Sequence, residues 1–157
     1  MPRKTLTGLA CAVAAGLIVF AVGYFFGPAI NEATPAAAAE NAVTFPPLDQ
    51  LVHYTTVRRG VTREHMLTNP EALAAIKAGQ PVAVGTHVVL VDYQSDVLYR
   101  YLVAQKTGEG SADWAYQWFW PDKSIKADEN TSQCYSCHRS REDRQFMFTF
   151  TDALSFK

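Results

Sequence analysis

Two cysteines and a histidine stand within five consecutive positions near the carboxy terminus of this 157-residue chain. The run reads Cys134-Tyr135-Ser136-Cys137-His138. A C-x-x-C-H run is typical of covalent attachment of a c-type haem. Two thiols at this spacing reach the two vinyl groups of one porphyrin, and the adjacent histidine becomes an axial ligand of the iron. The motif therefore predicts one covalent haem c, bound by Cys134 and Cys137, with His138 as the proximal iron ligand.

Three other interpretations of the motif are weaker. A zinc site needs four ligands, and the remaining histidines, His53, His65 and His87, are not at zinc-finger spacing. A thioredoxin-like redox pair is expected beside a βαβ unit, which the sequence does not indicate. A disulfide between Cys134 and Cys137 would close a very tight ring and would leave His138 unexplained.

The amino terminus carries a long uncharged run, Leu6 to Phe26, directly after Arg3 and Lys4. A helix needs about 20 apolar residues to cross a bilayer, so the run is long enough for a retained single-span anchor. Small residues before Glu40 also suit signal-peptidase cleavage near Ala39. Positive charge before the run places the rest of the chain outside the cytoplasm in both cases. We expect a periplasmic protein, either soluble after cleavage or anchored to the inner membrane.

Length and charge limit the remaining possibilities. We expect residues 1–39 to form the signal peptide or anchor and the start of a linker, 40–47 the linker proper, and 48–157 one domain. The formal net charge is −1, which argues against a nucleic-acid binder because such proteins usually carry a surplus of Lys and Arg.

The pattern of apolar residues predicts a mainly β domain of the α+β class. One short helix is expected over residues 70–78, with Asn69 capping its first amides, Pro70 in its first turn and Gly79 as a left-handed end. Alternating or β-branched segments predict the strands of an antiparallel sheet. These segments are residues 51–57, 61–67, 86–93, 97–103 and 113–120. A last strand is expected over residues 145–151, with Phe146, Phe148 and Phe150 on one face. The sequence thus predicts five or six strands with one or two short helices.

Residues 113–120 are strongly aromatic, and two interpretations stay open. The rings could simply pack the core of the sheet. They could instead form the wall of a large, flat cofactor pocket.

The position of the motif restricts the type of cytochrome. Only 19 residues follow His138, and the single methionine among them, Met147, is best explained as packing in a strand. A sixth iron ligand would therefore come from earlier in the chain, where Met66 and His65 are the candidates, or would be absent.

Several segments occur in a recognisable order. They are Tyr54-Thr55-Thr56, the helix start Thr68-Asn69-Pro70, the Gly-Thr strand from Val84 to Val91, the aromatic strand from Trp114 to Phe119, and Asp143 to Thr149 after the haem motif. Together with the carboxy-terminal motif, this order resembles the cytochrome P-460 and cytochrome c′-beta family over residues 54–150.

The resemblance implies an antiparallel β fold, often dimeric, that holds one five-coordinate haem c with an open distal face. Cytochromes P-460 oxidise hydroxylamine, whereas cytochromes c′-beta bind nitric oxide and similar small ligands. The enzymes carry a Lys bonded to the porphyrin, on the strand after the Gly-Thr pair. Residues 78–105 contain no Lys, so the departure favours ligand binding or electron transfer with a redox partner protein. A hydroxylamine-oxidising oxidoreductase and a membrane-tethered haem subunit remain the alternatives.

Polar residues that could face the open side of the haem complete the set of candidates. His87 on the Gly-Thr strand is the first choice for a distal group, and the other polar candidates are His65, Glu64, Asp92 and Asp96. Arg139 and Arg141 follow the motif and could pair with a haem propionate, although each is equally well explained as a solvated charge.

Overall fold

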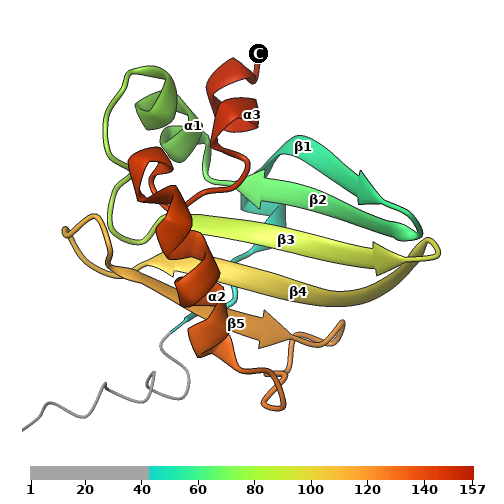
Figure 1. Cartoon of the computed structure of the whole chain (residues 1–157). Helices are drawn as coiled ribbons and strands as arrows, with labels where there is room; N and C mark the ends of the chain where they lie inside the picture. Colours follow the sequence, from blue (N-terminus) through green and yellow to red (C-terminus); the bar gives the residue numbers. More distant parts are fainter. Residues whose placement is uncertain (1–42) are drawn as a thin grey trace, which may run out of the picture. The chain divides into compact units, whose positions relative to one another are not determined.

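Five antiparallel strands form one sheet in the order β1-β2-β3-β4-β5 (Figure 1). The computed structural model describes residues 43–157, so the expected signal peptide or anchor lies outside the described residues. Within residues 43–157, no helix combines the length and the apolar character needed to cross a bilayer. The strands are β1 (Val52–Arg59), β2 (Thr62–Thr68), β3 (His87–Gln94), β4 (Val97–Lys106) and β5 (Trp114–Phe119).

Short helices complete the described part of the chain. They are α1 (Pro70–Lys77), α2 (Thr131–His138) and α3 (Phe150–Ser155), with 3-10 turns η1 (Leu48–Gln50) and η2 (Arg139–Arg144). Helix α1 packs against α3, and α2 packs on β5 and continues into η2. The mainly β, α+β class and the antiparallel sheet are therefore confirmed, and the sheet has five strands. The described residues form three short α-helices, whereas one or two were expected.

The expected helix at residue 70 is present, but its predicted cap is wrong. Pro70 opens α1 and Gly79 is left-handed, with φ 69°, as expected. The Asn69 side chain makes no capping hydrogen bond to the helix. Its Oδ1 instead accepts a hydrogen bond from the backbone amide of His87 at 2.8 Å. Asn69 therefore ties the start of α1 to the start of β3.

The strand predicted over residues 145–151 is also wrong. Gln145 and Phe146 are left-handed, with φ 51° and 62°, and the chain enters α3 at Phe150. Phe146 and Met147 are consecutive and both buried, whereas Phe148 is half exposed. This burial lacks the alternation of a strand, so the regular spacing of phenylalanines in the sequence was misleading.

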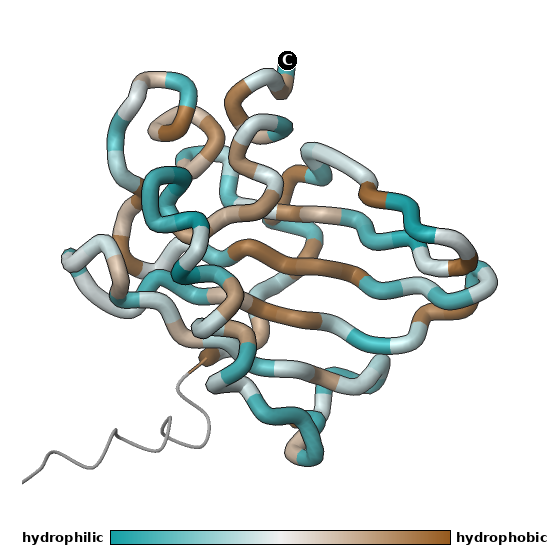
Figure 2. Tube along the Cα trace, in the orientation of Figure 1, coloured by the Kyte–Doolittle hydropathy of each residue, from teal (hydrophilic) through white to brown (hydrophobic). Residues whose placement is uncertain are grey.

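The sheet has an apolar core on each face. The middle of β3 and of β4 is hydrophobic along consecutive residues (Figure 2), and consecutive residues of a strand face opposite sides of the sheet. The inner core contains Met66, Val88, Leu102, Tyr116 and Phe146 together with α1, α3 and the chain between α2 and α3. The outer core is built on Val89, Val91, Tyr101, Val103 and Phe119.

Residues that were expected to be linker cover part of the outer core. Val43 is buried, and the ring of Phe45 lies edge-on to those of Tyr101 and Phe119, with centroids 5.1 Å apart in each pair. The packed domain therefore extends to Val43, five residues before its expected start.

Candidate functional site

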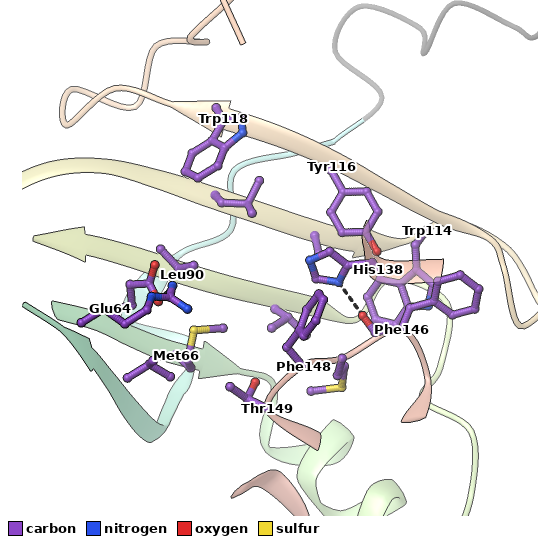
Figure 3. A pocket seen from close by; sticks show the side chains of 16 residues that line it. Glu64, Met66, Leu90, Trp114, Tyr116, Trp118, His138, Phe146, Phe148 and Thr149 are labelled. Atoms are coloured by element: carbon purple, nitrogen blue, oxygen red, sulfur yellow. Dashed lines mark hydrogen bonds and ion pairs between the residues drawn. The ribbon is translucent and has the colours of Figure 1, made fainter. Parts of the chain in front are cut away.

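A cavity of about 340 Å³ lies on the inner face of the sheet. Its wall takes residues from all five strands and from the segment between α2 and α3 (Figure 3). The lining residues are Val57, Arg59, Glu64, Met66, Val88, Leu90, Leu102, Ala104, Trp114, Tyr116, Trp118, His138, Phe146, Met147, Phe148 and Thr149. The volume falls within the range of about 300–1,000 Å³ found for small-molecule and cofactor sites, which are also mostly apolar.

His138 ends α2 and lines this cavity. Its Nδ1 lies 2.5 Å from the backbone carbonyl oxygen of Phe146. A carbonyl can only accept, so Nδ1 carries the proton and donates it, which leaves the Nε2 lone pair free for a metal. Burial lowers the pKa of His138 below its ordinary value, against a smaller opposing effect of the bond to Phe146. Burial therefore favours the neutral ring, and the bond to Phe146 sets the tautomer in which Nε2 can ligate a metal.

Aromatic rings hold His138 in place. The centroid of Tyr116 lies 4.8 Å from that of the imidazole, and Phe148 meets it edge-on at 4.9 Å. Figure 3 shows the imidazole between these rings, with the dashed bond to Phe146. The left-handed turn at Gln145 and Phe146 brings the Phe146 carbonyl to this position. The wrongly predicted strand is therefore the segment that orients the histidine.

Both motif cysteines lie on α2, one turn apart, and are not joined by a disulfide. Positions three apart on a helix share one side. Asn130 caps the helix, because its side chain accepts the amide of Ser132 at 3.1 Å. Cys134 packs against the inner core, and Cys137 is exposed. Burial raises the pKa of the Cys134 thiol, whereas redox-active cysteines have lowered pKa values. The arrangement therefore does not favour a thioredoxin-like pair.

The structure separates the three candidates for a distal group. Met66 is buried and lines the cavity. His65 and His87 do not line it, because adjacent residues of a strand face opposite sides of a sheet and the lining positions are Glu64, Met66 and Val88. His65 instead packs between the rings of His53 and Tyr93.

His87 lies on the outer face of the sheet, with its Nε2 3.3 Å from Thr44 Oγ1. The first-choice distal residue is thus placed outside the cavity, and Met66 is the member of the set that lies in its wall.

The remaining polar candidates also differ in whether they line the cavity. Glu64 lines the cavity. Asp92 is buried but does not line it, and Asp96 is exposed and paired with Arg63 at 3.1 Å. Neither Arg139 nor Arg141 lines the cavity. Arg139 is exposed, and the Arg141 guanidinium stacks 5.0 Å from the centre of the Phe148 ring.

A row of charged side chains crosses one end of the inner face. The backbone register places Glu64 opposite Asp92, and Asp92 opposite Arg100. Arg100 binds Asp92 Oδ2 at 3.0 Å and Glu129 at 2.5 Å, and its guanidinium stacks 3.9 Å above the ring of Trp118. Glu64 pairs with Arg59. These contacts tie the sheet to the segment that leads into α2.

The aromatic strand contributes side chains to both faces of the sheet. Trp114, Tyr116 and Trp118 alternate along β5 and line the cavity, while Phe119 belongs to the outer core. Sequence reasoning missed Arg59 and Thr149 as lining residues. The bulge between His53 and Thr55 sets which side of β1 faces inward, and a bulge has no clear signal in the alternation of this strand.

The residues present fit a haem c. The lining includes one histidine with a free ring nitrogen, and the wall is largely aromatic and aliphatic. Both thiols lie on the helix that carries the histidine. Two buried donors in the wall, Tyr116 Oη and Trp114 Nε1, have no hydrogen-bond partner among the described residues. No group of three or more His, Cys, Asp or Glu side chains within residues 43–157 is arranged to hold a metal ion by itself, and a haem iron needs only the one histidine.

Comparison of the sequence with models of known protein families and with curated proteins gives no match, so the resemblance to the cytochrome P-460 and cytochrome c′-beta family stays a prediction.

Proposed function

We propose that this chain is an exported mono-haem c-type cytochrome that binds small neutral ligands such as nitric oxide, transfers electrons, or does both. The observation that carries the proposal is the position of His138. The histidine of the C-x-x-C-H run lines a largely apolar cavity and has its tautomer set by the Phe146 carbonyl. A haem held there by Cys134, Cys137 and His138 would supply a one-electron redox centre that can also take small ligands.

The chain's own residues would give such a centre its properties. The bond from His138 Nδ1 to the Phe146 carbonyl orients the ring and increases the electron density on Nε2. The opposite wall is mostly apolar, with Met66, Leu90 and Leu102 on neighbouring strands. An apolar wall excludes water and disfavours anions, because burying an unpaired charge is costly. The site therefore favours neutral diatomic molecules over charged ones.

The test is covalent haem staining of the full chain on a denaturing gel. We expect the wild type to stain and a Cys134→Ser/Cys137→Ser variant not to, since the thioether bonds would be lost. His138→Ala should keep the stain, because both thioethers remain, but should change the optical spectrum through loss of the axial ligand. A stain that persists without either cysteine would contradict the proposal.

The second candidate is an enzyme that oxidises hydroxylamine or a related nitrogen compound. One observation favours it: Glu64 is a carboxylate that lines the cavity, and such an oxidation needs a group that accepts protons. Against it, no Lys lines the cavity within the described residues. Steady-state turnover of hydroxylamine with an electron acceptor, together with a red-shifted Soret band of the reduced protein, would favour the enzyme.

Location and partners are part of the same proposal. Export follows from the amino-terminal run, and a retained run would tether the cytochrome to the inner membrane as a subunit of an electron-transfer complex. Fractionation of cells separates the two forms, since a cleaved protein is found in the periplasmic fraction. A homodimer, which the family resemblance implies, is tested by sedimentation of the purified protein.

A further inference from the structure

The proposed haem would lie on the inner face of the sheet, with its two ends toward opposite edges. Both cysteines lie on α2, which packs on β5 at one edge. Thioethers form at the vinyl groups, and the propionates leave from the two pyrroles on the other side of the porphyrin. The cavity extends from β5 to Val57 and Arg59 on β1. The carboxylate end of the haem is therefore expected toward β1 and β2.

Arg59 is the one Arg or Lys residue among the described residues that line the cavity. It ends β1, and its side chain is 67% exposed, whereas that of its partner Glu64 is only 12% exposed. Glu64 lies at the end of the cavity away from Trp114 (Figure 3). A cation is thus available at the end toward which the propionates are expected.

Arg59 also has unused hydrogen-bonding capacity. A guanidinium carries five N–H donors, and Glu64 is the only ion-pair partner of Arg59 within residues 43–157. Arg100, the other arginine on this face, is already held by Asp92, Glu129 and the Trp118 ring. Of the two, Arg59 is the one that can take a further carboxylate.

We propose that Arg59 binds a haem propionate and that Glu64 competes with the propionate for the same guanidinium. The assignment rests on the proposed haem c, and it makes Arg59 and Glu64 the pair that adjusts the reduction potential. A cation near the iron disfavours the ferric state, and an anion favours it. Arg59 raises the potential by neutralising the propionate, and Glu64 lowers it by drawing on the same charge.

The experiment measures the midpoint potential of the full-length protein with its covalent haem by spectroelectrochemistry. Arg59→Gln should shift the potential downward, and Glu64→Gln should shift it upward. Arg59→Lys should lie between the wild type and Arg59→Gln, since it keeps the charge but loses the paired donors. Arg58→Gln is the matched control: it removes the same charge one residue earlier in β1, from a side chain that does not line the cavity. Its shift should be the smaller one.

Three outcomes would overturn the assignment. The first is an equal shift for Arg59→Gln and Arg58→Gln, which would mean a general charge effect. The second is a potential that Tyr116→Phe changes but Arg59→Gln does not, which would place the propionates beside the buried donors of β5. In the third outcome, acetate at constant ionic strength changes the potential of the wild type but not that of Arg59→Gln. This would mean that Arg59 binds a free anion instead of a propionate.

Failure of the inference and failure of the proposed function are distinguishable. A wild type without covalent haem stain contradicts the haem itself. A stained wild type with a potential insensitive to Arg59 contradicts only the propionate site.

Discussion

Met66 and His65 are adjacent in β2 but face opposite sides of the sheet, and this one-residue difference decides which of them can act on a bound group. Met66 lines the cavity, and His65 packs on the outer face against His53 and Tyr93. We expect Met66→Ala to change the optical spectrum or the nitric oxide affinity of the haem-loaded protein, because it alters the wall of the cavity. His65→Gln and His87→Gln should leave both unchanged. Absorption spectra and ligand titration check the three variants.

The two histidine variants are also the decisive controls for that prediction. Loss of an iron ligand changes the absorption spectrum of a haem. If His87→Gln produced such a change, the placement of His87 on the outer face would be contradicted. An unchanged spectrum and affinity in Met66→Ala would remove Met66 from the distal group.

At the scale of elements, α1 supports the cavity from behind through its contact with α3 and the inner core. Ile76 is the most deeply buried residue of α1, at 1% exposure. Ile76→Ala should lower the free energy of unfolding by about 2–5 kcal/mol, since it leaves a cavity in a packed interior. Val84→Ala, at a side chain that is 47% exposed, should change it by less than about 0.5 kcal/mol. Urea titration measures both, and equal effects would contradict the described packing of α1.

Which elements the sequence predicts depends on how each one is stabilised. The strands β1 to β5 were predicted from segments that alternate or that are rich in β-branched and aromatic residues. Residues 145–151 show a similar spacing of phenylalanines, yet tertiary contacts decide their conformation: the Phe146 carbonyl accepts from His138, and Gln145 bonds to the backbone of Val82 and Gln80. The partners of Gln145 lie 63 and 65 residues earlier in the chain, and contacts of that kind leave no local periodicity.

The same distinction applies to the candidate site. The motif predicts Cys134, Cys137 and His138 as site residues from local spacing alone, and of these His138 lines the cavity. The wall of the cavity depends on register, since a shift of one residue moves every side chain to the other face. His87 was the first choice for a distal group because that register was unknown, and the structure places His87 on the outer face and Met66 in the cavity wall. The Arg59–Glu64 pair depends on the register as well.

At the scale of the whole molecule, the outer face carries histidines whose ionisation opposes folding. Burial lowers the pKa of His65 and of His87 below the ordinary value of 6.5. The unfolded chain therefore binds more protons than the folded one at a pH just below 6.5, and stability rises with pH there. The contribution of these groups is fully present above 6.5 and is lost as the pH falls from 6.5 through their folded pKa values.

A variant that lacks both imidazoles isolates this effect from the titration of carboxylates. Urea midpoints of the wild type and of His65→Gln/His87→Gln, compared at about pH 7.5 and about pH 5.5 on either side of the histidine range, should show a smaller acid-induced loss in the variant. Both residues lie outside the cavity, so the prediction holds whether or not a haem is bound at His138. An equal loss in the two proteins would mean that the imidazoles of the outer face take up protons as readily in the folded state as in the unfolded chain.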